Sequence, residues 1–417
     1  MREPQLLSGW GRTAPTRADV LRPRAVADVV EAFEHERHVI ARGLGRAYGD
    51  AAQNAGGAVL DMTGLRCVVA LDLERGVVTA EAGLDLDALI ALVLPHGWFV
   101  PVTPGTRHVT LGGAIACDVH GKNHHVDGSF SRHVERFELV TPDGEVREVL
   151  PGQELFAATA GGMGLTGVIT QVRLKLIPVA SAFMRVTTLR APNLDELMTS
   201  MRARDADFRY SVAWVDCLRR GAGLGRGIVL WGDHAEPGEL PGGGPPLAYA
   251  SAVRLGVPDL VPSGVLNTHT AKAFNALWYA KAPAQERASY EGIAAFFHPL
   301  DAVAGWNRLY GRRGFVQYQA VVPDDAADAV RALLERVSGA GTSSFLAVLK
   351  RFGPGGRGSD MLSFPMPGWT LALDIPAGAP DLAAVLDELD ALVVAAGGRV
   401  YLAKDARVRP DLSLIHI

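Results

Sequence analysis

The chain has 417 residues, of which 48% are hydrophobic and 21% are charged, and its formal net charge is −4. These fractions are typical of a globular protein and exclude the disordered and fibrous classes. The length suits two domains or one large one. The slightly acidic charge argues against nucleic acid as a partner.

The cysteines and the hydropathy of the chain further limit the class of protein and its compartment. Cys67, Cys117 and Cys217 are too few and too widely spaced for a disulfide framework or a metal knuckle. The first residues lack the apolar run of a signal peptide, and no segment reaches the roughly 18 apolar residues of a membrane span. We therefore expect a protein that starts in the cytoplasm and is soluble or peripheral.

The first 180 residues predict short strands that alternate with helices. Helices are predicted from apolar spacing over 26–36, 85–97 and 154–160, with Asp85 as an N-cap and Gly97 as a stop. Strands are predicted over 38–41, 58–62, 68–72, 76–83 and 168–179, and a hairpin over 137–149 with its turn at 142–144. Residues 101–133 show no periodicity and are rich in Gly, Thr and His.

The second half predicts a sheet that helices cover on one side. Strands are predicted over 315–322, 345–352 and 369–376, and amphipathic helices over 324–338 and 381–396. This order is typical of an α+β layer. Polar segments rich in turn residues predict mobile loops over 236–247, 281–290 and 353–360.

Three glycine clusters, at 42–50, 104–125 and 161–167, carry the chemistry of the first half. Glycines allow the main chain to approach a ligand closely and to present N–H groups to phosphate. The first cluster alone is equally explained as a glycine-rich turn, and its spacing is not that of a Rossmann fingerprint. Together, the three clusters suit an extended dinucleotide across the domain, with its flat ring over residues 112–120.

Four histidines, His120, His124, His125 and His133, raise the alternative of a metal site. Gly121 and Asn123 disfavour the helix that would align them, and no cysteine pair or carboxylate completes a ligand set. We expect no metal, and a hydrogen-bonded imidazole is the simpler interpretation of each. His120 ends the glycine stretch beside Lys122, which predicts a polar pair at the edge of the ligand. Cys117 is best explained as a small buried hydrophobe.

The motifs at 41–57, 104–125 and 154–169 resemble the FAD-binding domain of the vanillyl-alcohol-oxidase (p-cresol methylhydroxylase type, PCMH) superfamily. More narrowly, the chain resembles the decaprenylphosphoryl-β-D-ribose 2′-oxidase family of actinobacteria over nearly its whole length. The resemblance implies an α+β, two-domain PCMH-type fold. Residues 1–184, completed by 399–417, would hold FAD, and residues 185–398 would form a sheet-plus-helices substrate domain.

The resemblance also implies roles for individual residues. FAD would be held without a covalent link by Arg42, Gly43, Leu44, Gly45, Arg46, Ala47, Tyr48, Gly49, Asp50, Gly105, Thr110, Leu111, Gly112, Gly113, Cys117, Asp118, Val119, His120, Ile169 and Tyr401. The substrate pocket would contain Gln317, Gln319, Lys350, Trp214 and Phe352. Lys404, His120 and Lys122 would be catalytic. Lys404 would accept the hydroxyl proton if burial lowers its pKa, and an ion pair with a phosphate or Asp405 is the alternative.

The activity implied is oxidation of the C2′ hydroxyl of decaprenylphosphoryl-β-D-ribose to a ketone, a step toward the arabinose donor of cell-wall arabinan. A partner NAD(P)-dependent short-chain reductase would complete the epimerisation. The lipid-linked substrate implies a membrane-peripheral position, with the periplasm as the alternative compartment. An oxygen-using alditol or sugar-lactone oxidase of the same superfamily is the alternative activity.

The sequence departs from the family pattern at several positions. Ala372 and Thr370 stand where many members have cysteine and asparagine, and Phe297 replaces a tyrosine. Thiol-directed inhibitors would therefore lose their target. The end of the chain, DLSLIHI, suggests a truncated or frame-shifted tail, with weaker FAD binding as the expected consequence.

Overall fold

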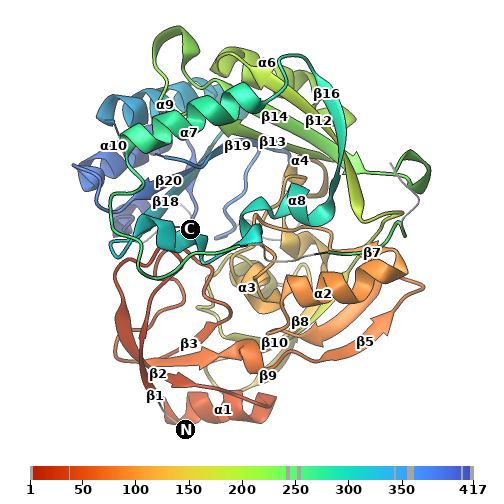
Figure 1. The fold of residues 1–417 in the computed structure, drawn as a ribbon. Helices are drawn as coiled ribbons and strands as arrows, with labels where there is room; N and C mark the ends of the chain where they lie inside the picture. Colours follow the sequence, from red (N-terminus) through yellow and green to blue (C-terminus); the bar gives the residue numbers. More distant parts are fainter. Residues whose placement is uncertain are drawn as a thin grey trace.

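The computed structural model describes residues 3–36, 38–240, 245–250, 255–341, 344–354, 361–404 and 407–413. Figure 1 shows two halves, one built from the first 180 residues and one from the rest of the chain. Parts of two loops predicted to be mobile, at 241–244 and 355–360, lie outside the described residues. The α+β fold class predicted from the sequence is confirmed.

A mixed sheet of four strands forms one end of the first half, in the order β1-β2-β4-β3. Its strands are β1 (Glu3–Leu7), β2 (Thr16–Leu21), β3 (Val39–Arg42) and β4 (Ala58–Asp61). Helix α1 (Val26–His35) connects β2 to β3 and buries Val29 and Ala32 against Leu60 and Met62. Strand β3 runs parallel to β4, so the loop that follows β3, residues 43–50, begins at the same end of the sheet as the chain that follows β4.

An antiparallel sheet of five strands completes the first half, in the order β5-β6-β10-β8-β9. Its strands are β5 (Val68–Asp72), β6 (Val77–Glu81), β8 (Val134–Val140), β9 (Val146–Val149) and β10 (Val168–Lys175). The helices of this region are α2 (Leu86–Val93), α3 (Leu111–Ala116), α4 (His124–Asp127) and α5 (Glu154–Thr159). A short pair, β7 (Trp98–Phe99) with β11 (Ile177–Pro178), leads toward the second half. The predicted N-cap of α2 is present, since Asp85 accepts from the Ala88 N–H at 2.9 Å. Gly97, with φ 79°, ends the 3-10 turn Leu94–His96 that follows α2.

The helix α3 lies inside the stretch where the sequence shows no periodicity. The Thr110 hydroxyl caps it by accepting from the Gly113 N–H at 3.2 Å. Two of its six residues are glycine, which hides the helical pattern, since glycine disfavours helices. Gly112 packs closely on the residue after β6, because a Cβ there would lie 3.1 Å from the Ala82 Cβ, a tight contact.

An eight-stranded sheet dominates the second half, in the order β16-β12-β14-β13-β19-β20-β18-β21. Its strands are β12 (Phe183–Ala191), β13 (Tyr210–Val215), β14 (Gly227–His234), β16 (Arg287–Gly292), β18 (Phe315–Val322), β19 (Ala347–Phe352), β20 (Gly368–Pro376) and β21 (Arg399–Val400). The helices are α6 (Leu194–Arg204), α7 (Thr268–Lys281), α8 (Ile293–Phe297), α9 (Asp328–Ala340), α10 (Leu382–Ala395) and α11 (Pro410–Ser413). A small parallel pair joins β15 (Leu255–Gly256) to β17 (Val303–Ala304).

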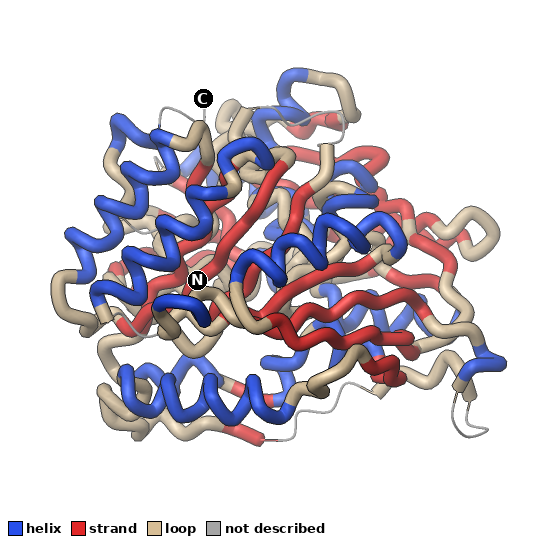
Figure 2. Tube along the Cα trace, turned by 90° about the horizontal axis from the view of Figure 1, so that it is seen from above, coloured by secondary structure: helices blue, strands red, loops and turns tan. Residues whose placement is uncertain are grey.

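Helices cover one face of this sheet, its outer face, as predicted, and a hydrophobic core lies between them and the strands. Side chains of α6, α9 and α10 pack with the sheet around buried Trp231 and Trp369. Figure 2 shows these helices and α7 along one side of the strands. The expected loop at 281–290 is partly wrong, because α7 ends at Lys281 and β16 begins at Arg287. Since β16 is an edge strand with largely exposed residues, it lacks the apolar alternation that would have revealed it.

The inner face of the same sheet turns toward the first half. Along β18, Tyr318 and Ala320 join the outer core, so Gln317 and Gln319 face inward. The same alternation on β19 sends Ala347 and Leu349 outward and places Val348 and Lys350 inward. Strands β18 and β19 thus supply the polar side chains of one wall, Gln317, Gln319 and Lys350, and the alternation of side chains along a strand predicts that they face the same way.

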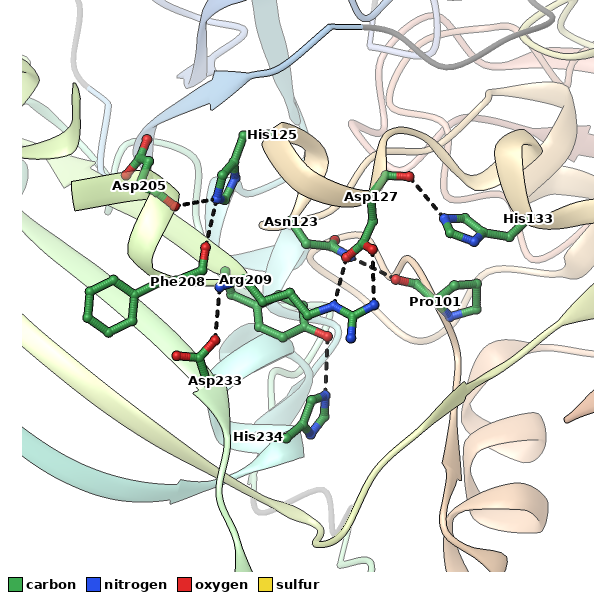
Figure 3. A network of polar contacts seen from close by, with 11 residues as sticks. Pro101, Asn123, His125, Asp127, His133, Asp205, Phe208, Arg209, Asp233 and His234 are labelled. Atoms are coloured by element: carbon green, nitrogen blue, oxygen red, sulfur yellow. Dashed lines mark hydrogen bonds and ion pairs between the residues drawn. The ribbon is translucent and has the colours of Figure 1, made fainter. Parts of the chain in front are cut away.

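Polar contacts join the two halves (Figure 3). Asp127 in α4 accepts from Nε of Arg209 at 2.8 Å and from its Nη2 at 3.0 Å. Nε2 of His125 lies 2.9 Å from the Phe208 carbonyl oxygen, and Nε2 of His133 lies 3.0 Å from that of Asp127. These two histidines therefore make hydrogen bonds to the backbone.

The chain after β21 returns to the first half. Strand β21 pairs with β18, and the Tyr48 N–H then donates to the Ala403 carbonyl at 3.0 Å. Residues 399–400 therefore lie on the large sheet, while 401–404 contact the loop 43–50. The domain boundaries at 184/185 and 398/399 stay a prediction. None of the helices in the described part of the chain has the length and hydropathy needed to span a membrane.

Candidate functional site

A cavity of about 260 Å³ lies where the inner face of the eight-stranded sheet meets the glycine-rich segments of the first half. Its walls are residues 43–48, 104–106, 109–110, 113, 116–117 and 119–120 from the first half, Gln317, Gln319, Val348, Lys350 and Ala372 from the sheet, and residues 401, 403 and 404. The structure thus brings together segments that lie more than 350 residues apart in the sequence.

The loop 43–50 is held close to helix α3. A Cβ on Gly43 would lie 2.3 Å from Oγ1 of Thr110, the residue that caps α3, so only glycine fits there. Gly45 has φ 63°, in the region that favours glycine. The guanidinium of Arg42 donates to the carbonyls of Ser8 at 2.7 Å and Ala52 at 2.9 Å. This anchoring exposes the main chain of residues 43–48 to the cavity.

The segment after α3 forms the floor of the cavity. Cys117 and Val119 line it, and burial raises the pKa of the Cys117 thiol to about 11. The thiol is therefore protonated at neutral pH, in agreement with a small buried side chain. Asp118 does not line the cavity. Its buried carboxylate accepts from the Ser129 hydroxyl at 2.8 Å and the Ser131 N–H at 3.0 Å.

His120 is the centre of a buried polar chain. Nζ of Lys350 lies 3.0 Å from its Nδ1, and Nε2 of Gln319 lies 3.0 Å from its Nε2. Burial and the charge of Lys350 hold the pKa of His120 well below its usual value, so the imidazole is neutral. The amide nitrogen of Gln319 can only donate, so Nε2 of the neutral ring accepts from it and the ring N–H is at Nδ1, where the neutral amine of Lys350 accepts it.

Two lysines at the cavity have lowered pKa values. Burial lowers the pKa of Lys350 to about 7, helped by the charges of Lys404 and Lys122. Burial lowers the pKa of Lys404 to about 8, against the opposing effect of Asp374. Nζ of Lys404 lies 4.0 Å from the centre of the Tyr48 ring. Both amines titrate near neutral pH, which suits groups that exchange protons.

Asp374 is a buried carboxyl next to this site that sequence reasoning missed. It lies opposite Gln317 across β18 and β20, and its Oδ1 accepts from the Gln317 side chain. Burial raises the pKa of Asp374 to about 7. The signal available in the sequence was a charged residue, Asp374, inside the strand 369–376, whose only other polar residue is Thr370.

Ten of the expected site residues do not line this cavity. They are Arg42, Gly49, Asp50, Leu111, Gly112, Asp118, Lys122, Ile169, Trp214 and Phe352. Nζ of Lys122 donates to the Phe296 carbonyl and lies 4.1 Å from the Phe296 ring centre. Trp214 donates from Nε1 to the Phe345 carbonyl at 3.4 Å. Phe352 packs behind His120, with ring centres 4.7 Å apart.

Several lining residues were absent from the sequence expectations. Trp10, Thr106, Met163, Leu300, Trp306, Leu346 and Val348 all border the cavity. Most are apolar and carry no pattern that separates them from core residues. Ala372 does border the cavity, whereas Phe297 is buried against Phe99 and Tyr210.

Comparisons with known proteins agree with this arrangement. Residues 19–150 match the family described as FAD binding domain. The chain is 43% identical to decaprenylphosphoryl-beta-D-ribose oxidase of Mycolicibacterium smegmatis, over 97% of this chain and 90% of the relative. It is 45% identical to an uncharacterized protein in the mprA 5′ region of Streptomyces coelicolor, over 79% of this chain and 91% of that protein. An alditol oxidase from a Streptomyces species is 23% identical over 56% of this chain and 51% of its own.

The match to decaprenylphosphoryl-beta-D-ribose oxidase spans nearly all of both proteins. It includes the glycine-rich segments and the sheet strands that form the cavity. The match to alditol oxidase covers about half of each protein. The chain therefore belongs to the family of FAD-dependent oxidoreductases that includes decaprenylphosphoryl-beta-D-ribose oxidase.

Proposed function

We propose that this protein oxidises the C2′ hydroxyl of decaprenylphosphoryl-β-D-ribose to a ketone. The observation that carries the proposal is the placement of Lys404, Lys350, His120 and two glutamines around one cavity. The 43% identity to a decaprenylphosphoryl-beta-D-ribose oxidase supports this choice of substrate.

The cavity fits an extended dinucleotide. A Cβ added at Gly105 meets no atom within 4 Å, so the main chain there borders open space. Ala41, Ala51, Ala52 and Ala116 keep the adjoining wall equally free of bulk. The loop 43–48, Gly105, Thr110, Gly113 and residues 117–120 would hold FAD, which supplies the acceptor for the hydride that leaves C2′.

We propose that FAD is held without a covalent bond. Both ring nitrogens of His120 face other side chains, Lys350 and Gln319, at 3.0 Å. The thiol of Cys117 is held protonated by its raised pKa. Neither side chain is therefore available as a nucleophile toward the flavin in this arrangement.

The residues of the chain have separate tasks in the proposed reaction. The neutral amine of Lys404 accepts the proton of the C2′ hydroxyl as the C2′–H bond breaks and the C=O bond forms. The amides of Gln317 and Gln319 orient the ribose by hydrogen bonds. The neutral amine of Lys350 holds the Nδ1–H tautomer of His120 by accepting from it, and its own N–H groups donate to a sugar oxygen.

Two wider proposals follow from the substrate. The ketone product needs a hydride donor of opposite facial selectivity, so we propose a separate NAD(P)-dependent short-chain reductase as the partner. A lipid-linked substrate also requires contact with a membrane. Helix α7 exposes Phe274, Leu277 and Trp278, of which Leu277 is 72% exposed, and Lys272 and Lys281 lie on the same helix. An apolar surface with basic neighbours is suited to an anionic bilayer.

The test is the visible spectrum of the purified protein under anaerobic conditions. We expect an oxidised-flavin spectrum that bleaches when farnesylphosphoryl-β-D-ribose is added and stays unchanged with xylitol. Bleaching by xylitol alone would assign the protein to the alditol oxidases instead. Protein that binds no FAD after incubation with the cofactor would contradict the proposal.

A further inference from the structure

A second cavity, of about 460 Å³, adjoins the first and opens more widely to solvent. Trp10 and the loop residues Leu44, Gly45 and Arg46 line both cavities. The remaining wall contains Arg12, Asp259, Asn307 and Arg308. We call this the arginine cavity.

Four guanidinium groups line the arginine cavity, those of Arg12, Arg42, Arg46 and Arg308. One carboxylate faces them, that of Asp259, which pairs with Arg12 at 2.7 Å. The formal charge of the lining is thus four positive and one negative. Arg308 donates to the Val257 carbonyl at 3.0 Å, a contact that leaves its charge uncompensated.

Arg46 lies between the two cavities. Its guanidinium stacks on Trp10, with the central carbon 3.8 Å from the ring centre. Its Nε is buried and has no hydrogen-bond partner among the described residues. A buried donor without a partner is costly, so an anionic ligand that accepts from it would be bound strongly.

The walls of the arginine cavity are fixed before any ligand arrives. The Trp10 N–H donates to the Ala47 carbonyl at 2.8 Å, and the Asn307 side chain donates to the Trp10 carbonyl at 2.9 Å. Arg42 donates to the Ser8 carbonyl at 2.7 Å. These contacts connect three separate segments of the chain, so little ordering is needed when a ligand binds.

We infer that the arginine cavity binds the phosphodiester of the lipid-linked riboside while its ribose occupies the first cavity. This inference rests on the proposed function. The two cavities share a wall, as a substrate with an anionic group beside its sugar requires. The lipid must leave the protein beyond the phosphate, which suits the more open cavity. Asp259, Asn307 and Arg308 also come from the half of the chain predicted to bind substrate.

The test compares a charged with an uncharged riboside. Arg308→Gln should raise KM for farnesylphosphoryl-β-D-ribose about ten-fold, since a hydrogen bond to a charged group is lost. It should leave kcat/KM for methyl β-D-ribofuranoside and the FAD content unchanged. Arg308→Lys keeps the charge and should restore most of the affinity. Arg313→Gln, at an arginine that lines neither cavity, is the matched control.

Three results would overturn the inference: equal losses with both ribosides, release of FAD by Arg308→Gln, or an unchanged KM. If Arg308→Gln fails to fold, the inference is tested instead by the KM of Arg308→Lys and by the dependence of the wild-type KM on salt concentration. KM for the charged riboside should then rise with ionic strength while that for the neutral one stays constant. Calorimetric titration with farnesyl methyl phosphate, which carries no sugar, separates the phosphodiester site from the proposed oxidation. This compound should bind to the arginine cavity even if neither riboside is oxidised.

Discussion

Lys350 and His120 lie 230 residues apart in the chain, yet Nζ of the lysine is 3.0 Å from Nδ1 of the imidazole. The lysine comes from β19 in the large sheet, and the histidine follows α3 in the first half. Their contact fixes the histidine tautomer and places a titrating amine at the cavity. It therefore ties the protonation state of the proposed active site to the correct packing of the two halves.

Replacement of Lys404 by Gln should slow flavin bleaching by farnesylphosphoryl-β-D-ribose by about 10²-fold or more, as expected for loss of a general base. FAD binding should persist. Because burial lowers the Lys404 pKa to about 8, the neutral, proton-accepting form grows as pH rises through 8. The wild-type bleaching rate should therefore rise over that range, and stopped-flow measurements at several pH values test it. Lys175→Gln, at an exposed lysine at the end of β10, is the control. Equal rates in Lys404→Gln and wild type would exclude Lys404 as the base.

Replacement of Asp374 by Asn should shift this pH profile to lower pH. The charge of Asp374 raises the pKa of Lys404, so its removal lets that pKa fall further. The Asn side chain still accepts from Gln317 through its Oδ1, which preserves the local hydrogen bond. The midpoint of the bleaching rate against pH is the measurement. A midpoint that stays in place or moves upward would show that the two groups are not coupled in this way.

Replacement of Gly43 by Ala should weaken FAD binding and destabilise the protein by about 1–3 kcal/mol. The added Cβ would lie 2.3 Å from Thr110 Oγ1, which forces the loop 43–50 away from α3. Thermal melts with and without FAD, together with a flavin titration, measure both effects. Gly339→Ala serves as control, because Gly339 is in α9 and a Cβ there meets no atom within 4 Å. A Gly43→Ala variant with unchanged FAD affinity would show that the close contact is dispensable.

Acid precipitation of the FAD-loaded protein should release all of its flavin into the supernatant. This follows from the proposed non-covalent binding, in which the His120 ring nitrogens face Lys350 and Gln319. Flavin absorbance in the supernatant and the pellet is the measurement. A yellow pellet, with the flavin mass attached to a peptide containing His120 or Cys117, would contradict it.

The double replacement of Leu277 and Trp278 by Ser should reduce sedimentation with phosphatidylglycerol vesicles about ten-fold or more, since two apolar side chains no longer enter the bilayer. Bleaching by a short-chain, water-soluble riboside should be unaffected, because Ala271 of α7 packs in the core on the outer face of the sheet, and no residue of α7 lines the cavity. Leu6→Ser is the control, since Leu6 is 63% exposed on β1 in the other half. Unchanged sedimentation of the double variant would remove α7 from the membrane proposal.

The sequence by itself determined the fold class and most of the regular elements. Apolar spacing predicted α1, α2, α9 and α10, because each of these helices buries one face against a hydrophobic core. Continuous apolar runs predicted β18 and β20, which are buried along most of their length. Neither pattern revealed α3, whose glycines serve close packing next to β6, or β16, whose residues are largely exposed. A local pattern is visible only where a run of large apolar side chains is buried, and neither α3 nor β16 has such a run.

The glycine motifs likewise indicated a dinucleotide site, because main-chain exposure requires glycine wherever the ligand is bound. Only the tertiary structure decided which polar side chains share the cavity. It turned Lys122 toward Phe296, placed Trp214 and Phe352 outside the lining, and added Asp374 beside Gln317. The direction of a side chain and the pKa of a buried amine depend on neighbours from distant segments. A local sequence pattern does not predict which residues from distant segments become those neighbours.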